Sequence, residues 1–387
     1  MDAGQGARAA PRAVPLHVLI CVNAAWNVWN FRRSLVARLL ADGHSVTVLA
    51  PPDEAASRLE AMGCRVLPLE MDVKGLNPLS DLRLTARLRR LFRQEQPDVV
   101  LGYTIKNNIF GALAARGMGF PFLPTVTGLG TAFLSGGMLQ RVAETLYKQA
   151  FRRLPVVFFQ NGDDSGLFLS RGLVRPGQVR HMPGSGIDLG RFTASPMPDP
   201  DGGAPVFLMI ARLLRDKGVR EFVEAARLIH AAGIPARFQL VGAAGVDNRS
   251  AIPLAEVEGW VAEGIVEYPG PQQDVRPFIR AATCVVLPSY REGAPRTLIE
   301  ASAMARPVIA TDVPGCRAVV KEGETGFLCQ PRDPRSLADV LHRFLALPAA
   351  EQARMGQAAR ALMERDYDET LVIEAYLAAI RDHVPRR

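Results

Sequence analysis

The chain has 387 residues, of which 48% are hydrophobic, 22% charged and 7% aromatic. This length favours two domains over a single core, and the ordinary composition argues against a collagenous or disordered chain. No uninterrupted apolar run reaches about 18 residues, so we expect no membrane-spanning helix. A peripheral membrane protein remains compatible with this composition.

The positive charge is unevenly distributed. The formal net charge is +7, with a pI near 9.4, which suggests a polyanionic partner. Up to residue 195 the chain carries 23 Lys and Arg against 14 Asp and Glu, and beyond it 23 against 25. The basic excess therefore belongs to the N-terminal half.

The cysteines and the N-terminus indicate a cytoplasmic protein. The five cysteines are odd in number, widely spaced and without neighbouring histidines, so neither a disulfide framework nor a zinc site is expected. Residues 1–15 contain no apolar segment typical of a secretory signal. We interpret them as a short disordered arm.

Short apolar runs rich in β-branched residues alternate with helical patterns along the chain, which predicts βαβ units and parallel sheets. In the first half we expect helices such as Asn30–Ala41 and Asp81–Gln94, and in the second half a closing helix over Glu369–Val384. The predicted strands of the first half are Leu16–Val22, Ser45–Ala50, Cys64–Leu69, Asp98–Gly102, Phe122–Val126 and Val156–Gln160. Those of the second half are Pro205–Ala211, Ala236–Val241, Val266–Tyr268, Cys284–Pro288, Pro307–Thr311 and Gly326–Cys329.

A stretch rich in Pro, Gly and Asp over residues 194–205 separates the two series and predicts an interdomain linker. The expected organisation is a domain over 16–193, the linker, a second domain over 206–365, and a C-terminal helical segment over 366–387 that crosses back to the first domain. The predicted fold class is α/β, with two doubly wound, Rossmann-like domains facing one another across a cleft. Ligands of such sheets bind at the carboxyl ends of the strands.

The densest functional signal lies between residues 287 and 315. A predicted strand ends before Glu292, a helix follows from about Arg296 to Ala305, and Glu300 lies eight positions after Glu292, inside that helix. A carboxylate before a helix, followed by free backbone amides at Gly293, can bind sugar hydroxyls and other oxygens. The alternative is that Glu292 caps the helix and Glu300 is a solvated carboxylate. The residues alone leave both interpretations open.

A second signal follows the first strand of the second half. Arg212 and Lys217 lie five residues apart in a predicted strand-to-helix loop, where two cations can hold a nucleotide diphosphate. The alternative is a solvated basic turn partly neutralised by Asp216. The sequence lacks the glycines of a Walker motif before Lys217.

Small residues form a third, weaker signal. Gly128, Leu129 and Gly130 follow a predicted strand and permit close backbone approach to a ligand or to another part of the chain. Two D-x-D pairs, Asp199/Asp201 and Asp366/Asp368, lie in the predicted linker and in a turn. Metal binding is not expected there, because oxygen ligation of a cation needs several convergent groups.

Together these motifs resemble those of the retaining, nucleotide-sugar-dependent glycosyltransferases of family 4, which have the GT-B fold. The resemblance rests on Arg212 and Lys217, on the Glu292/Glu300 pair within P-S-x-x-E-G-x-P, and on the run P-V-I-A-T-D-V-P-G. It covers about residues 16 to 384. In the first half, Y-T-I-K before N-I-F-G, and T-G-L-G, resemble the bacterial branch that extends polyprenyl-diphosphate-linked sugars, including the bacillosamine-extending galactosaminyl transferase type.

The resemblance implies a role for each matching residue. Arg212 and Lys217 would hold the donor diphosphate and stabilise the charge that develops on it. Glu292 would accept hydrogen bonds from donor-sugar hydroxyls, and Glu300 would hold the ribose. The donor sugar would also contact the backbone of Gly293, Ala294 and Pro295, and the base would lie near Gly270, Pro271 and Gln272. The family needs no side-chain nucleophile, and we expect no cofactor and no metal.

The sequence departs from the family in three places. The first strand leads into Asn23–Asn30, taken here as a loop, without paired glycines, so phosphate contact by that segment is in doubt. A histidine near the donor sugar of many relatives is replaced by Ile105, beside Lys106. Ala305 stands where glycine is common, which costs little if the position is helical. Asn23 and Lys106, with Gly128, Leu129 and Gly130, are our candidates on the acceptor side.

Two predicted helices combine basic and apolar residues, over Asp81–Gln94 and Met138–Leu154. Such helices can rest on anionic lipid. The alternative is a core-facing helix with a solvated arginine face.

The expected function is transfer, with retention, of a hexose or N-acetylhexosamine, with GalNAc, GlcNAc or Gal favoured. The expected donor is a UDP-sugar and the acceptor a polyprenyl-diphosphate-linked saccharide, for a cytoplasmic protein held at the inner face of the cytoplasmic membrane. One alternative is an isomerase similar to UDP-N-acetylglucosamine 2-epimerases. The other is a basic nucleic-acid-binding protein, disfavoured because no interleaved aromatic and basic motif is present.

Overall fold

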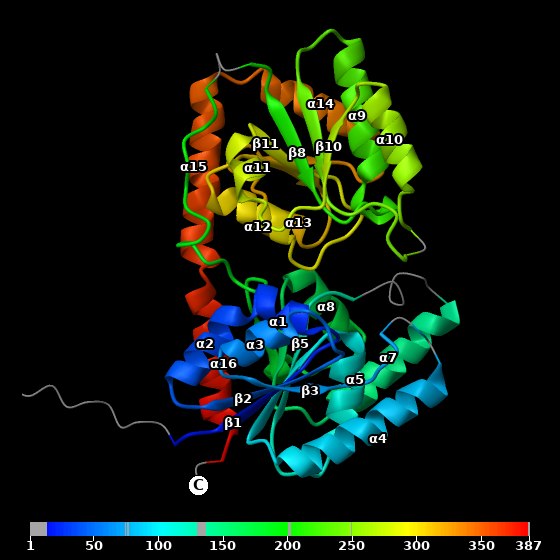
Figure 1. The fold of residues 1–387 in the computed structure, drawn as a ribbon, viewed down its shortest axis with the longest axis vertical. Helices are drawn as coiled ribbons and strands as arrows, with labels where there is room; N and C mark the ends of the chain where they lie inside the picture. The colour runs from blue at the N-terminus through cyan, green and yellow to red at the C-terminus, as the bar shows by residue number, and fades with distance from the viewer. Residues whose placement is uncertain are drawn as a thin grey trace, which may run out of the picture. The chain divides into compact units, whose positions relative to one another are not determined.

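The computed structural model describes residues 14–73, 75, 77–129, 137–199, 203–248 and 250–385. Within these residues the strands form one seven-stranded and one six-stranded sheet (Figure 1). Residues 1–13 of the expected disordered arm, Gly130 and Asp201 lie outside the described part of the chain.

The first sheet has the strand order β3-β2-β1-β4-β5-β6-β7. The pairs β3–β2, β2–β1, β1–β4 and β4–β5 are parallel. Its strands are β1 (His17–Cys21), β2 (Ser45–Ala50), β3 (Arg65–Pro68), β4 (Val99–Tyr103), β5 (Phe122–Val126), β6 (Val157–Phe159) and β7 (Val179–His181). The helices of this part are α1 (Ala25–Phe31), α2 (Arg33–Ala41), α3 (Ala56–Ala61), α4 (Pro78–Glu95), α5 (Ile105–Ala114), α7 (Gly137–Phe151), α8 (Gly162–Ser170) and the 3₁₀ turn η1 (Pro176–Gln178).

The second sheet has the order β10-β9-β8-β11-β12-β13, and all its strand pairs are parallel. Its strands are β8 (Val206–Ile210), β9 (Arg237–Val241), β10 (Glu267–Gly270), β11 (Cys284–Leu287), β12 (Val308–Thr311) and β13 (Gly326–Cys329). The helices that follow β8 in the chain are the 3₁₀ turn η3 (Arg215–Lys217), α9 (Val219–Ala231), α10 (Leu254–Ala262), α11 (Arg276–Ala281), α12 (Arg296–Ala303), α13 (Cys316–Val319), α14 (Pro334–Leu345), α15 (Ala349–Asp366) and α16 (Glu369–His383). Figure 1 shows α9, α10 and α14 on one face of this sheet and α11, α12 and α15 on the other.

Both sheets are doubly wound. In each of them the strand order reverses between the first strand and the fourth, at β1/β4 and at β8/β11. Side chains that follow these strands meet at one edge of the sheet, where ligands of such folds bind. The predicted α/β class with two doubly wound sheets is therefore confirmed.

Aromatic side chains fill the core of the second sheet. Phe207, Phe222 and Phe238 are at most 1% exposed, and the ring of Phe238 lies 5.3 Å from that of Phe207 and 5.5 Å from that of Phe222. Helix α9 buries Val219, Phe222, Val223, Ala226 and Ile229, a spacing of three and four residues that places all of them on one face. The packing of this face against the sheet explains why the helical pattern was readable in the sequence.

The chain divides into two compact units by its contacts. One contains Met1–Thr125, Val142–Val157 and Leu377–Arg387, and the other contains Val126–Arg141 and Phe158–Tyr376. We call them the first and the second unit. The domain limits expected from the sequence, including the linker over 194–205 and the crossing of the C-terminal helix, stay predictions.

Each of the predicted strands is present, with its ends within two residues of those expected. Three local expectations are wrong. Residues 25–30 of the segment taken as a loop lie in helix α1 (Ala25–Phe31), in which Ala25 and Val28 are buried and give the segment an apolar face. Strand β7 was not predicted, because three residues with a mainly exposed pattern carry no periodic signal. Helix α12 ends at Ala303, and Ala305 has a φ of 59°, so this position is left-handed instead of helical.

Within the part of the chain that the structure describes, no helix is both long enough and apolar enough to cross a bilayer.

Candidate functional site

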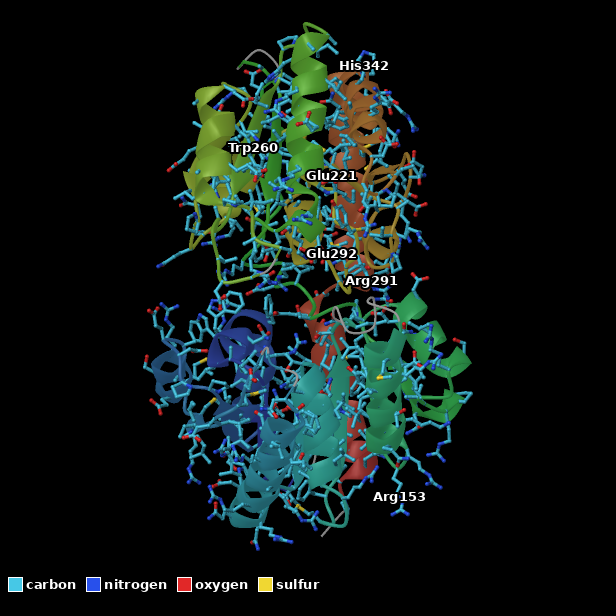
Figure 2. All side chains as sticks on the ribbon, turned by 90° about the vertical axis from the view of Figure 1, so that its right-hand side faces the viewer. Arg153, Glu221, Trp260, Arg291, Glu292 and His342 are labelled. Atoms are coloured by element: carbon cyan, nitrogen blue, oxygen red, sulfur yellow. The ribbon has the colours of Figure 1, made fainter. Side chains whose placement is uncertain are left out.

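The site predicted in the second half is built where the second sheet reverses its strand order. Strands β8 and β11 are neighbours, and the loops after them carry the candidate cations and Glu292. Figure 2 shows Arg291 and Glu292 toward one end of the part built around the second sheet. His342, which lies on α14, is toward the other end. The topology thus brings together two motifs that are 75 residues apart in the chain.

The loop after β8 turns sharply into helix α9. Leu213 and Leu214 are buried, whereas the Arg212 side chain is exposed and forms no hydrogen bond or ion pair within the described part of the chain. Gly218 has a φ of 75°, and a Cβ there would overlap the carbonyl of Pro288. Only glycine therefore allows this loop to approach the end of β11, which places Lys217 beside the second motif.

Lys217 and Glu292 form an ion pair. The Lys217 Nζ to Glu292 Oε1 distance is 2.6 Å, and the two side chains are 23% and 12% exposed. Both groups are thus partly shielded from water. An ion pair in such a partly buried place is stronger than one at the surface. The pair combines the two groups expected of a donor site. The cation can bind a diphosphate, and the carboxylate can accept hydrogen bonds from sugar hydroxyls.

Backbone packing positions the loop that carries Glu292. The Glu292 N–H donates to the Pro314 carbonyl at 3.3 Å. A Cβ on Gly315 would lie 2.5 Å from the backbone carbonyl oxygen of Glu292. On its other side, a Cβ on Gly293 would overlap the carbonyl of Thr127 and lie 3.4 Å from the Gly128 Cα. Glycine at these positions is therefore required by close approach between chain segments.

Glu300 lies on α12 and belongs to a separate group of contacts. Its Oε1 accepts from the Arg296 Nε at 2.8 Å, and the Glu300 side chain is 14% exposed. Arg296 also donates to the Ser185 Oγ at 3.0 Å and to the Gly186 carbonyl at 2.6 Å. Burial raises the pKa of Glu300, and the attraction of Arg296 only partly opposes this shift.

Gly270, Pro271 and Gln272 lie at the carboxyl end of β10, on the same edge of the sheet as the loop after β8. The Gly270 carbonyl accepts from the Gly242 N–H at 3.2 Å, and the Gln272 Nε2 donates to the Pro269 carbonyl. Ala294 and Pro295 continue the loop of Glu292 into α12. The structure therefore gathers the predicted donor residues at one edge of the second sheet.

The acceptor-side candidates are distributed differently. Asn23 follows β1 and its Oδ1 accepts from the Asn27 Nδ2 at 3.2 Å. Lys106 is in the first turn of α5 after β4, and its Nζ lies 2.8 Å from the Asp81 Oδ1. Both residues therefore flank the β1/β4 reversal of the first sheet. Gly128 has a φ of 143°, the Leu129 side chain is 2% exposed, and Gly130 lies outside the described residues.

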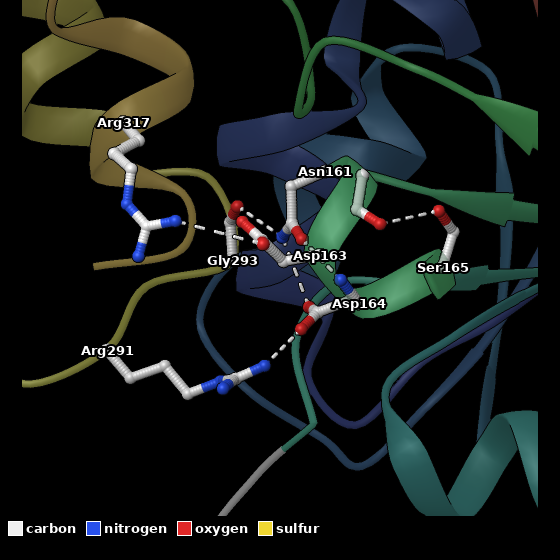
Figure 3. Close-up of polar contacts among 8 residues, drawn as sticks. Asn161, Asp163, Asp164, Ser165, Arg291, Gly293 and Arg317 are labelled. Carbon is white, nitrogen blue, oxygen red and sulfur yellow. Dashed lines mark hydrogen bonds and ion pairs between the residues drawn. The ribbon is translucent and has the colours of Figure 1, made fainter. Parts of the chain in front are cut away.

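Sequence reasoning missed three polar residues beside Glu292, namely Asn161, Asp164 and Arg291. Figure 3 shows Arg291 paired with Asp164, and Asn161 hydrogen-bonded to the Gly293 carbonyl. Asn161 followed three residues later by Asp164 is readable as a helix start. Their contact with residues about 130 positions later is set by the tertiary fold and has no local signal.

Metal-ligating groups were also searched for. The described residues hold no cluster of three or more His, Cys, Asp or Glu side chains placed to bind a metal ion. Asp366 is paired with Arg365, and Asp368 accepts from Thr370. Metal independence stays a prediction.

Comparison with known proteins relates both halves of the chain to sugar transfer. A model described as glycosyl transferase 4-like domain matches residues 28–185, and one described as glycosyl transferases group 1 matches residues 204–346. An N,N'-diacetylbacillosaminyl-diphospho-undecaprenol α-1,3-N-acetylgalactosaminyltransferase of Campylobacter jejuni is 26% identical over 92% of this chain and 96% of its own length.

Solved structures agree in fold. A glycosyltransferase from Rickettsia africae has a TM-score of 0.76 at 18% identity and covers 95% of this chain and 98% of its own. The Anabaena protein HepE, solved in complex with UDP-glucose, has a TM-score of 0.75 at 18% identity and covers 95% of this chain and 100% of its own. At these identities the likeness shows the fold alone.

Proposed function

We propose that this chain, which belongs to the family 4 glycosyltransferases of the GT-B fold, transfers a hexose or N-acetylhexosamine from a UDP-sugar to a polyprenyl-diphosphate-linked saccharide. GalNAc, GlcNAc and Gal are the favoured sugars. The observation that carries the donor part is the Lys217–Glu292 pair at the β8/β11 reversal. It joins a cation suited to a diphosphate and a carboxylate suited to sugar hydroxyls.

The donor is held by residues of the loops after β8 and β11 and by Glu300 on helix α12. Arg212, exposed and without a partner among the described residues, and Lys217 bind the diphosphate. Glu292 accepts from the sugar hydroxyls, and Glu300 accepts from the ribose diol. The structure of HepE, which has a similar fold, was solved with UDP-glucose. This supports a UDP-sugar as the donor of the present chain.

The chemical step needs charge stabilisation more than a nucleophile. As the glycosidic bond breaks, negative charge grows on the departing diphosphate, where Arg212 and Lys217 stabilise it. The acceptor hydroxyl attacks from the face that the diphosphate leaves, which retains the anomeric configuration. The departing phosphate takes the proton of that hydroxyl. Two fixed cations supply the charge that a metal ion would otherwise provide.

The acceptor is proposed to be lipid-linked and bound by the first unit at the inner face of the cytoplasmic membrane. The Campylobacter relative, by its name, acts on a diphospho-undecaprenol-linked sugar. Helix α4 supports this proposal, because Leu79 and Leu82 are 64% and 67% exposed beside arginines of the same helix. Exposed apolar residues next to cations are suited to anionic lipid.

The test is a screen of UDP-sugars against polyprenyl-diphosphate-linked acceptors, read by mass spectrometry. We expect the acceptor mass to increase by one hexose or N-acetylhexosamine, with EDTA leaving the rate unchanged. Epimerised UDP-sugar formed without acceptor would instead indicate an isomerase. Salt-sensitive binding of DNA or RNA without UDP-sugar binding would indicate a nucleic-acid-binding protein. Loss of activity in EDTA, restored by Mg²⁺ or Mn²⁺, would contradict metal independence.

A further inference from the structure

A buried carboxylate stands at the start of helix α8. The Asp164 side chain is 1% exposed, and its backbone N–H donates to the Asn161 Oδ1 at 2.8 Å, which makes Asn161 the N-cap of α8. Asn161 already satisfies the helix start, and a carboxylate in the first turn needs no burial for its effect on the helix dipole. The burial of Asp164 therefore calls for another explanation.

Asp164 contacts the loop that carries Glu292. Its Oδ1 accepts from the Arg291 Nη2, and its Oδ2 accepts from the Asn161 Nδ2 at 3.1 Å (Figure 3). Burial raises the pKa of Asp164, and Arg291 opposes that shift. A buried carboxylate with one guanidinium partner fixes that partner's position, because separating them would leave an unpaired buried charge.

Asn161 holds the other side of the same loop. Its Nδ2 donates to the Gly293 carbonyl at 2.9 Å. The peptide after Gly293 is trans, so its N–H, that of Ala294, points away from the carbonyl that Asn161 holds. This Ala294 N–H donates to no atom of the described residues. Glu292 is thus flanked by two residues that are each held by the start of α8.

We propose that Asp164 and Asn161 are positioning residues for the donor-sugar site, acting through Arg291 and Gly293 to orient the Glu292 carboxylate and the Ala294 N–H. This inference rests on the proposed function of Glu292. The pair touches neither Lys217 nor Glu300 in the described structure. The expected effect is therefore on the sugar and not on the nucleotide.

The test is a comparison of Asp164→Asn and Asn161→Ala with Asp163→Asn. Asp163 is a matched control: it lies in the same turn, is 49% exposed, and meets Arg317 only at 3.9 Å. We expect the first two variants to lower kcat for transfer by roughly 10- to 100-fold, the range for a misplaced reacting group. The affinity for UDP, measured by calorimetry, should stay within about twofold, as expected when only the transition state loses contacts.

A double-variant cycle separates positioning from folding. In a Glu292→Ala background, followed under single-turnover conditions with excess enzyme, Asp164→Asn should cause no further loss, because it acts through the missing carboxylate. An equal loss in both backgrounds, or a fall in UDP affinity equal to the fall in kcat, would show a structural role and overturn the inference. Arg291→Lys, with melting temperatures recorded for all variants, covers the case in which Asp164→Asn fails to fold.

The outcome for the proposed function is read separately. A wild-type protein that transfers sugar, with Asp164→Asn indistinguishable from Asp163→Asn, overturns the positioning role alone. A wild-type protein that neither binds UDP nor turns over any UDP-sugar overturns the proposed function and the positioning role with it.

Discussion

Lys217 and Glu292 form an ion pair in which the two charges neutralise each other, with an Nζ to Oε1 distance of 2.6 Å. A diphosphate that binds Lys217 must compete with this carboxylate, and a sugar that binds Glu292 must compete with the ammonium. The pair therefore favours a ligand that offers both partners at once, which a nucleotide sugar does and free UDP does not.

The first prediction follows from this competition. In Glu292→Gln the carboxylate that competes for Lys217 is removed, so UDP should bind several-fold more tightly than to the wild type. Sugar transfer should fall about 100-fold or more, as for loss of a group that stabilises the transition state. Lys217→Ala should lose transfer and UDP affinity together. Calorimetry and initial rates measure both quantities, with Glu256→Gln, which breaks an exposed pair with Arg220, as the control. Unchanged or weaker UDP binding in Glu292→Gln would contradict the competition.

Glu300 gives a prediction on pH. Its pKa is raised above the usual 4.5 by burial, so its contribution to stability is fully present below 4.5 and is lost as the pH rises through the raised value. Above pH 4.5 the burial of this carboxyl therefore destabilises the fold relative to a neutral side chain, and at pH 7 Glu300→Gln should melt at a higher temperature than the wild type. The difference should disappear towards pH 4.5.

The variant Glu300→Gln should also lose its contact with the ribose. The loss of a charged acceptor weakens UDP affinity by about 10-fold or more. Arg296 keeps its bonds to Ser185 and Gly186 in this variant, so it is not left without partners. Melting curves and UDP titrations from pH 4.5 to 7.5 test both effects. A lower melting temperature at pH 7 would show that the Arg296 attraction outweighs the burial.

At the scale of elements, most boundaries follow from local patterns, and the exceptions have physical causes. Helix α4 begins at Pro78, after the N-cap Asn77, whose side chain accepts from the Leu79 N–H, and it ends where Gln96 is left-handed. Helix α1 was missed because its seven residues are too few for a clear periodic pattern. Ala305 was expected to be helical, whereas it closes α12 in a left-handed conformation.

Ala305→Gly should stabilise the fold. A left-handed conformation costs a non-glycine residue about 1 kcal/mol, which glycine avoids. The free energy of unfolding, from urea titration, should therefore rise by somewhat less than this amount, since glycine also increases the entropy of the unfolded chain. Ala301→Gly, inside α12, should lower it. A destabilised Ala305→Gly variant would show that the methyl group of Ala305, which is 9% exposed, contributes more by packing than its backbone costs.

At the scale of the whole molecule, the excess of positive charge lies in the first 195 residues, and the remainder is nearly neutral. The second unit places a few cations at one edge of its sheet, as binding of one diphosphate requires. Helix α4 buries Leu84, Leu88 and Phe92 against the first unit and leaves other leucines and most of its arginines outside. The core-facing side of α4 is therefore compatible with the proposed contact of its other side with lipid.

Membrane association yields a prediction for α4. The variant Leu79→Ser/Leu82→Ser should bind anionic phospholipid vesicles about 100-fold less strongly, since each leucine that is fully transferred into the lipid contributes on the order of 1.5 kcal/mol or more. Leu254→Ser on α10, where the leucine is 47% exposed, serves as the control. UDP affinity should be unchanged in all variants. Equal vesicle binding by the wild type and the double variant in a co-sedimentation assay would exclude α4 as the lipid contact.

The α/β class, the strands of both sheets other than β7, and the motifs that contain Arg212, Lys217, Glu292 and Glu300 could be read from the sequence alone. These are readable because hydrophobic periodicity and turn residues act over a few positions. Only the tertiary structure decided which distant groups meet. The Lys217–Glu292 contact depends on β8 lying next to β11, and the contacts of Asn161 and Asp164 with residues 291–293 join segments about 130 residues apart. Strand order, close approach at glycines and burial create these contacts, and none of them leaves a periodic trace along the chain.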